Sequence, residues 1–195
     1  MSDNTFLLVG AGGHAKAIVE ALGENALMSY VDAVDAPWLS AQRIGDDETA
    51  LQSAEPENFV IGLGGVSSTA LEQRLMLFER YLASGRAAPP VCHPAAHVSP
   101  SAQIEEGAII LAGAIVQPGA VVGRAAIVNT GAIMEHDSSL GAGSHLAPRA
   151  VLLGGVTVGS CAMIGAGAVV LPSSEIHAGE LVSAISLYPA KSNAP

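Results

Sequence analysis

The most regular feature of the chain is an aliphatic residue at every sixth position from Val98 to Val182, and a small residue follows four positions later in most of these hexads. A period of six with one branched and one small inward position predicts a short strand and a tight turn, three of which close one triangular coil. Stacking the coils buries a core that no single repeat could bury alone. The aliphatic positions are Val98, Ile104, Ile110, Val116, Val122, Val128, Met134, Leu140, Leu146, Leu152, Val158, Ile164, Val170, Ile176 and Val182.

The first third of the chain has a different pattern. Residues 5–9 predict a strand, residues 10–15 a glycine-rich turn, and residues 16–22 a helix that Gly23 ends before a second strand. Residues 58–63 predict a third strand. Thr69 and Glu72 predict a capping box for a further helix, which ends at Gly85. The apolar face expected for that helix consists of Leu71, Leu75, Phe78 and Leu82.

These patterns predict two domains. Residues 1–90 are expected to form an α/β nucleotide-binding βαβ domain of a half-Rossmann type, and residues 91–195 an all-β parallel β-helix with a C-terminal tail. A stiff, proline-containing stretch at 87–94 joins them. Because a complete dinucleotide-binding fold needs about twice as many residues as the first domain has, we expect it to hold one nucleotide.

The glycine-rich turn carries the first candidate chemistry. Gly10, Gly12, Gly13 and Ala15 follow the G-x-G-x-x-G/A fingerprint, and Asp32 lies about 20 residues further on. Glycines let the backbone approach a phosphate, and the amides at a helix N-terminus bind its charge, so any nucleotide diphosphate would suit this turn. The alternative is a tight strand-to-helix connection that binds nothing.

Composition narrows the class of partner. Eighteen acidic side chains against eight Lys and Arg give a formal net charge of −10, which repels nucleic acids and anionic membrane surfaces. Two cysteines, Cys92 and Cys161, lie far apart without metal-ligand spacing, and no leader or apolar run of about 18 residues is present. We therefore expect a soluble cytoplasmic protein with reduced thiols and no metal.

His136 is the candidate catalytic side chain of the repeat region. It occupies an outward hexad position beside Asp137, and a histidine paired with a carboxylate can act as a general base. The alternative is a solvated histidine in a turn. His145 follows nine residues later, where a corner is expected. Cys161 precedes an inward alanine and is interpreted as turn packing, not as a nucleophile.

The motifs together resemble a known family. The chain is similar to the bacterial nucleotide-sugar acetyltransferases of the sialic acid O-acetyltransferase-like, hexapeptide-repeat family, and most similar to enzymes that N-acetylate UDP- or GDP-linked 4-amino-sugars. The motifs are Gly10-Ala11-Gly12-Gly13-His14-Ala15-Lys16, Asn129-Thr130-x-x-x-x-Glu135-His136-Asp137, Leu140-Gly141-x-x-x-His145-x-x-Pro148, Gly154 and Ile164-Gly165. The glycine-containing hexads also resemble those of left-handed β-helices, which is the only source for the expected hand.

The resemblance implies a homotrimer that binds acetyl-CoA between neighbouring β-helices, with active sites shared by two subunits. It implies His136 as the base, Asp137 as its orienting acid where the family often has Glu, and the amide of Gly154 as the oxyanion donor. Asn129 and His145 would contact the sugar, or His145 the acetyl group. The residues implied for the pantetheine arm of CoA are Gly165, Ala166 and Ala184, and Gly154 is implied as a cofactor-binding residue whose amide faces the thioester oxygen. Those implied for the nucleotide are Gly10, Gly12, Gly13, His14, Asp32 and Gly64.

The implied reaction is direct attack of the sugar amine on the acetyl thioester, in the biosynthesis of a surface polysaccharide or other glycan. An O-acetyltransferase acting on a sugar or sialic acid, and a non-catalytic trimeric nucleotide-sugar-binding scaffold, remain alternatives. An NAD- or FAD-dependent oxidoreductase is disfavoured because the repeat leaves no second nucleotide-binding half. The choice between UDP and GDP stays open.

Overall fold

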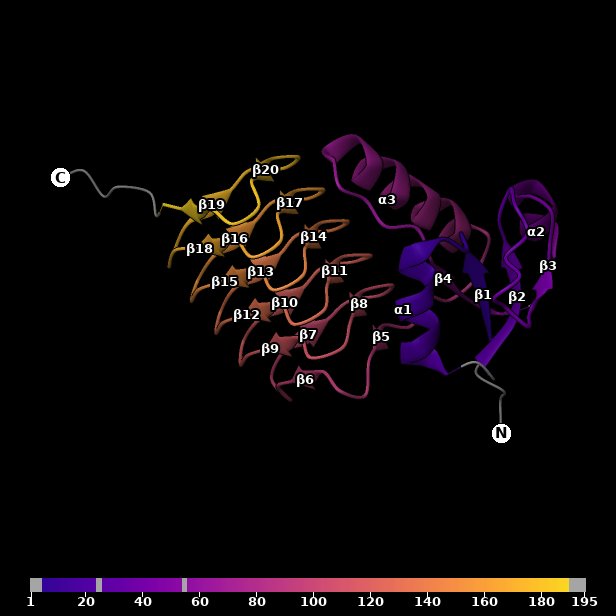
Figure 1. Ribbon diagram of the computed structural model, residues 1–195, viewed down its shortest axis with the longest axis horizontal. Helices are drawn as coiled ribbons and strands as arrows, with labels where there is room; N and C mark the ends of the chain where they lie inside the picture. The colour runs from indigo at the N-terminus through magenta and orange to yellow at the C-terminus, as the bar shows by residue number, and fades with distance from the viewer. Residues whose placement is uncertain (1–4, 24–25, 54–55, 190–195) are drawn as a thin grey trace.

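The computed structural model describes residues 5–23, 26–53 and 56–189. It consists of a small α/β unit lying beside one end of a long stack of two-residue strands (Figure 1). The tail predicted beyond residue 189 lies outside the described residues. Among the described residues, no helix is long and apolar enough to cross a membrane.

The N-terminal unit contains a parallel sheet of order β3-β2-β1-β4. Its strands are β1 (Phe6–Val9), β2 (Leu27–Val31), β3 (Gln42–Arg43) and β4 (Asn58–Ile61), and its helices are α1 (Gly13–Leu22), α2 (Asp47–Gln52) and α3 (Ser68–Ala83). Phe6 and Leu8 pack in the core that contains α1, whereas Leu7 and Val9 pack in the core that contains α3. The sheet therefore has helices on both faces, as parallel sheets usually have.

Several predicted boundaries in this unit were wrong. Helix α1 begins at Gly13, three residues earlier than predicted, so the last glycine of the turn is already helical. The cap of α3 is Ser67, whose hydroxyl accepts a hydrogen bond from the Ala70 amide, so the capping box at Thr69 does not form. Strand β3 and helix α2 were not predicted, because the polar segment around them has no clear apolar period.

The hexads form seventeen strands of two residues each. Their bounds are β5 (Val91–Cys92), β6 (His97–Val98), β7 (Gln103–Ile104), β8 (Ile109–Ile110), β9 (Ile115–Val116), β10 (Val121–Val122), β11 (Ile127–Val128), β12 (Ile133–Met134), β13 (Ser139–Leu140), β14 (His145–Leu146), β15 (Val151–Leu152), β16 (Thr157–Val158), β17 (Met163–Ile164), β18 (Val169–Val170), β19 (Glu175–Ile176), β20 (Leu181–Val182) and β21 (Leu187–Tyr188). Every third strand pairs in parallel, which gives three sheets that run from β5 to β20, from β6 to β21 and from β7 to β19. This stack confirms the predicted parallel β-helix.

The second residue of each strand points inward, and the predicted aliphatic series forms one continuous core. The corners have a left-handed backbone conformation, supplied by glycine at 107, 113 and 119 and then alternately by a non-glycine residue and by glycine up to Ile185. Asp137 and Cys161 are two of the non-glycine residues, with φ of 59° and 55°. The direction of the side chains at these corners is therefore set by a backbone conformation that few non-glycine residues adopt.

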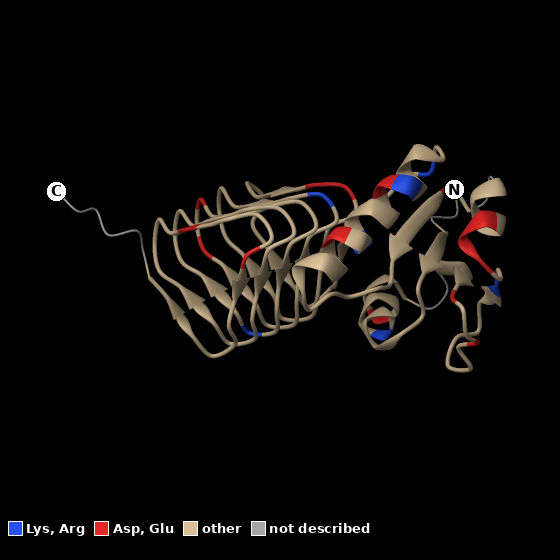
Figure 2. Cartoon of the chain, turned by 90° about the horizontal axis from the view of Figure 1, so that it is seen from above, with Lys and Arg blue, Asp and Glu red and all other residues tan. Residues whose placement is uncertain are grey.

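The three outer faces of the β-helix differ in polarity. On the β5–β20 sheet, Ile109 and Ile127 are fully buried, and Ile109 packs in the core of the N-terminal unit, so this outward apolar residue is covered by its own chain. On the β6–β21 sheet the outward residues Ile115, Ile133, Val151 and Val169 are apolar and only half-buried. The β7–β19 sheet presents mainly polar side chains. Lys and Arg are rare along the whole stack (Figure 2).

Candidate active site

His136 and Asp137 form a hydrogen-bonded pair on the corner between β12 and β13. Nδ1 of His136 lies 2.9 Å from Oδ2 of Asp137, and 65% and 74% of the two side chains are exposed. A carboxylate can only accept, so Nδ1 carries the hydrogen and Nε2 carries the free lone pair. One coil below, a methyl group at Gly119 would lie 2.5 Å from Oδ1 of Asp137. The carboxylate therefore occupies space that a glycine leaves open.

Gly154 lies one coil above His136 and touches the other side of the ring. A methyl group built on Gly154 would meet Nε2 of His136 at 2.6 Å. The Gly154 carbonyl accepts a hydrogen bond from the Ser173 amide, whereas the Gly154 amide has no partner among the described residues. A free N–H donor therefore lies beside a nitrogen that can accept a proton.

His145 lies on strand β14 and not at a corner, because it is the outward residue of its hexad. It is 5% exposed. Its Nδ1 donates to the Gly65 carbonyl over 2.7 Å, and its Nε2 accepts from Nδ2 of Asn129 over 2.9 Å. Burial lowers the pKa of His145, which keeps the ring neutral at pH 7. Both nitrogens are bonded to protein atoms, and a contact of His145 or Asn129 with the sugar remains a prediction.

His14 lies in the first turn of α1, with its ring centroid 6.5 Å from that of His145. Burial, and then the nearby Arg74 and His145, lower the pKa of His14 to about 3. A methyl group on Gly64 would lie 3.5 Å from Cβ of His14, so the loop after β4 packs closely on this turn. Nε2 of His14 is buried and has no partner in the described part of the chain. The neutral ring thus keeps one polar atom available.

Arg74 is a buried charge near this site that the sequence pattern did not single out. Its Nε donates to the Leu63 carbonyl over 2.8 Å, and its Nη1 donates to the Ala125 carbonyl of the β-helix. Burial lowers the pKa of Arg74 to about 10, so it stays charged at pH 7. A signal was present, since Arg74 falls in the same helical stripe as the buried Leu71 and Phe78.

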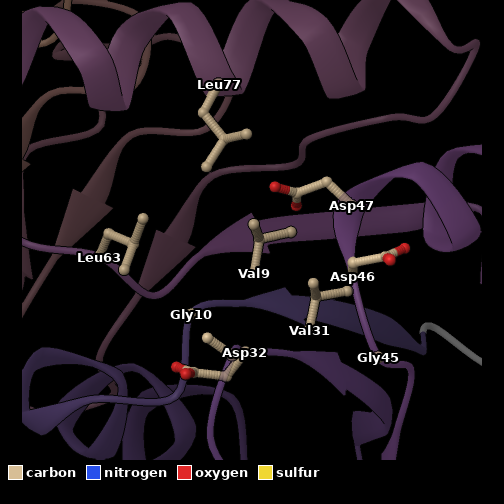
Figure 3. A pocket seen from close by; sticks show the side chains of 10 residues that line it. Val9, Gly10, Val31, Asp32, Gly45, Asp46, Asp47, Leu63 and Leu77 are labelled. Carbon is tan, nitrogen blue, oxygen red and sulfur yellow. The ribbon is translucent and has the colours of Figure 1, made fainter.

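A cavity of about 350 Å³ lies at the carboxyl ends of β1 and β2 (Figure 3). Asp32, predicted as a nucleotide ligand, accepts hydrogen bonds from the amides of Ala11 and Val34 at 2.8 and 3.0 Å, and these bonds lower its pKa. Its carboxylate therefore holds the glycine-rich turn in place. The residues that line the cavity are Val9, Gly10, Val31, Asp32, Ala33, Gly45, Asp46, Asp47, Leu63 and Leu77.

Gly12 and Gly13 lie outside that cavity, and a methyl group on either would meet nothing within 4 Å. They present open backbone at the start of α1. Gly165 lies between β17 and β18, where an added methyl group would meet the Ala184 amide at 2.4 Å. Because Gly165 has no side chain, its coil can pack closely on the next one. Ala166 and Ala184 occupy the same corner, one coil apart.

The predicted site residues fall on two different corners of the β-helix. His136, Asp137 and Gly154 lie where the β6–β21 sheet meets the β7–β19 sheet. Asn129, Gly165, Ala166 and Ala184 lie where the β5–β20 sheet meets the β6–β21 sheet, close to the loop after β4. One full side of the coil, on the order of 15–20 Å of extended chain, separates the two groups.

The described residues contain no group of three or more His, Cys, Asp or Glu that could hold a metal ion. Cys161 is buried beside Leu71 and Met163, and burial raises the pKa of its thiol. These surroundings disfavour a thiolate nucleophile.

Known structures share this fold over almost the whole chain. PerB from Caulobacter crescentus, in complex with CoA and GDP-perosamine, is 33% identical, with a TM-score of 0.85 over 95% of this chain and 88% of that one. The acetyltransferase domain of PglB from Neisseria gonorrhoeae, in complex with acetyl coenzyme A, is 29% identical, with a TM-score of 0.83 over 93% and 88% of the two chains.

A histidine-to-asparagine variant of perosamine N-acetyltransferase from Caulobacter crescentus, again in complex with CoA and GDP-perosamine, is 26% identical, with a TM-score of 0.77 over 96% and 95%. No protein-family model and no curated protein sequence matches the chain. The hexad stack, the outward His136–Asp137 pair and the 33% identity to PerB agree with one another. The chain belongs to the hexapeptide-repeat nucleotide-sugar acetyltransferases.

Proposed function

We propose that this protein transfers the acetyl group of acetyl-CoA to the amino group of a UDP- or GDP-linked 4-amino-4,6-dideoxy sugar. The observation that carries the proposal is the exposed His136–Asp137 pair beside the Gly154 amide, which has no hydrogen-bond partner among the described residues. The chain that contains this pair is 33% identical to PerB, whose structure was solved in complex with CoA and GDP-perosamine.

The pair supplies the base. Nε2 of His136 takes the proton from the sugar nitrogen as that nitrogen attacks the thioester carbon, and the C–N bond forms. The Asp137 carboxylate accepts from Nδ1–H and stabilises the imidazolium that results. The tetrahedral intermediate then collapses, the C–S bond breaks, and the CoA sulfur takes the proton back from His136. No covalent acyl-enzyme is required.

The Gly154 amide supplies the oxyanion donor. It has no hydrogen bond to the described residues and lies beside the base nitrogen, so an acetyl carbonyl placed at this corner can receive both groups. A donor oriented in advance toward the developing negative oxygen typically contributes on the order of 10²–10³ in kcat.

The N-terminal unit is proposed to bind the nucleotide sugar. The cavity beside Asp32 is large enough for a nucleoside. Its carboxylates Asp32, Asp46 and Asp47 suit the hydroxyl and N–H donors of a ribose or base rather than a phosphate. The open amides at Gly12 and Gly13 suit the diphosphate, because they lie at the N-terminus of α1.

We infer that the active site forms between copies of the chain in a homotrimer, because the two groups of site residues lie on different corners. The half-buried apolar face of the β6–β21 sheet lies between those corners. If three copies turn this face toward a common axis, the His136 corner of one copy meets the Asn129 corner of the next. Trimer formation then buries the apolar face and completes the site in one arrangement.

The proposal is tested by measuring thiol release from acetyl-CoA. The acceptors are a panel of UDP- and GDP-linked sugars that bear a 4-amino or a 4-hydroxy group. We expect turnover on a 4-amino-sugar nucleotide that is lost in His136→Ala and kept in His177→Ala, an exposed histidine on another corner. Turnover on hydroxy-sugars alone would make the protein an O-acetyltransferase. A lack of turnover on every acceptor, with nucleotide-sugar binding retained, would instead indicate a scaffold.

A further inference from the structure

Arg74 joins the two halves of the molecule through backbone carbonyls. It is fully buried on α3 and has no carboxylate within ion-pair distance among the described residues. Its guanidinium donates to the Leu63 carbonyl of the N-terminal unit and to the Ala125 carbonyl of the β-helix. A buried charge without an opposite charge is costly, so its placement calls for a role beyond packing.

The loop of residues 62–65, which follows β4, is held at two alternate peptide groups. Arg74 binds the Leu63 carbonyl and His145 binds the Gly65 carbonyl. Gly62, just before the first anchor, packs against the glycine-rich turn and leaves no room for a side chain, and Gly64, between the two anchors, contacts His14. The position of this loop therefore determines how the two glycine-rich segments face each other.

The second anchor continues into the β-helix. His145 accepts a hydrogen bond from Asn129, whose Oδ1 accepts from the Thr130 amide over 2.7 Å. His145 is also the only polar residue in its outward row on the β5–β20 sheet, where Val91, Ile109, Ile127, Met163 and Leu181 are apolar. The single polar residue of this row lies where the 62–65 loop contacts the sheet. A hydrogen bond fixes the loop at this position, whereas a hydrophobic contact alone would not.

We propose that Arg74 and His145 are positioning residues that hold the 62–65 loop against the β-helix and thereby set where the nucleotide sugar lies relative to the acetyl group. The inference rests on the proposed function and assigns that function two residues that act through the loop. Both side chains are buried and bonded to backbone carbonyls of the loop, His145 through Nδ1 and Arg74 through Nε, while Nη2 of Arg74 has no partner among the described residues.

Arg86 offers a matched control for Arg74. It is also a buried arginine, and it donates to the carbonyls of Ala50, Ser53 and Pro56, all within the N-terminal unit. We expect Arg74→Met to raise KM for the nucleotide sugar at least about tenfold and to lower kcat, with KM for acetyl-CoA nearly unchanged. Arg74→Lys should recover part of the loss. Arg86→Met should lower the melting temperature without this separation of the two KM values.

Hydrogen exchange tests the same inference without a substrate. Arg74→Met and His145→Ala should accelerate exchange at the amides of residues 64–66, and Arg86→Met should instead accelerate exchange near residues 50–53. Unchanged exchange at 64–66, or equal KM effects of Arg74→Met and Arg86→Met, would overturn the inference. A wild type that acetylates no acceptor would overturn the proposed function, whereas the exchange comparison still decides whether Arg74 and His145 hold the loop.

Discussion

The imidazole of His136 lies against the α-carbon of Gly154, one coil away, so closely that a single methyl group would meet Nε2 at 2.6 Å. This contact joins the proposed base to the proposed oxyanion donor. It also explains why a residue without a side chain is needed at a corner whose backbone places no demand for glycine, since Gly154 is not among the residues with positive φ.

Gly154→Ala is therefore expected to impair catalysis more than folding. The methyl group would displace the His136 ring from its place beside the amide, and kcat should fall on the order of 10²–10³-fold. Steady-state kinetics measure the fall, and the thermal unfolding midpoint serves as the control. Normal kcat in folded Gly154→Ala protein would contradict the proposed role of the contact.

Asp137→Asn tests the acid that orients the base. Asparagine tolerates the left-handed corner conformation that Asp137 adopts, so the fold should be preserved. The loss of the negative charge removes the stabilisation of the imidazolium, and kcat should fall at least about tenfold with little change in either KM. Asp137→Glu should retain more activity than Asp137→Asn; if both variants match the wild type, the carboxylate has no catalytic role.

Co-expression of two variants tests the proposed trimer, in which two copies share a site. Gly13→Glu places a negative charge at the proposed diphosphate site, where an acidic residue at the start of α1 should not harm the helix. His136→Ala removes the base on the other corner. Each variant alone should be inactive, and co-expression should restore about a quarter of wild-type activity if neighbouring copies supply the two halves. Co-expressed variants that stay inactive would place the whole site in one copy.

The lowered pKa of His14 predicts that the folded chain loses stability in mild acid. Its pKa is lowered to about 3 in the folded chain, so between pH 6.5 and 3 the unfolded chain binds a proton that the folded chain does not. The free energy of unfolding is therefore greatest above pH 6.5. It decreases as the pH falls, by about 2 kcal/mol between pH 6.5 and pH 5, because protonation of His14 favours the unfolded chain. Urea unfolding at pH 7 and pH 5, at one protein concentration, measures it. His14→Asn should show a smaller decrease, and an equal decrease in both proteins would exclude His14 as the source.

The β-helix could be predicted from the sequence because its signal is local and repeated. Each inward aliphatic residue lies six positions from the next, and the strand, the turn and the pairing partner eighteen residues away all follow from that spacing. The same period placed His136 on the outer surface beside its acid. The glycine-rich turn and its helix were likewise recognisable from neighbouring residues, although the first residue of the helix was not.

The tertiary structure alone decided which parts meet. Nothing in the hexad pattern indicates that Ile109 is covered by the N-terminal unit, because an outward isoleucine has the same local pattern whether or not another segment packs on it. The division of the site between two corners depends on how three sheets close around the coil. The contacts of Arg74 with Leu63 and Ala125 join segments far apart in sequence. The helical stripe of α3 indicates that Arg74 is buried but not which carbonyls it meets, because such pairings arise from packing.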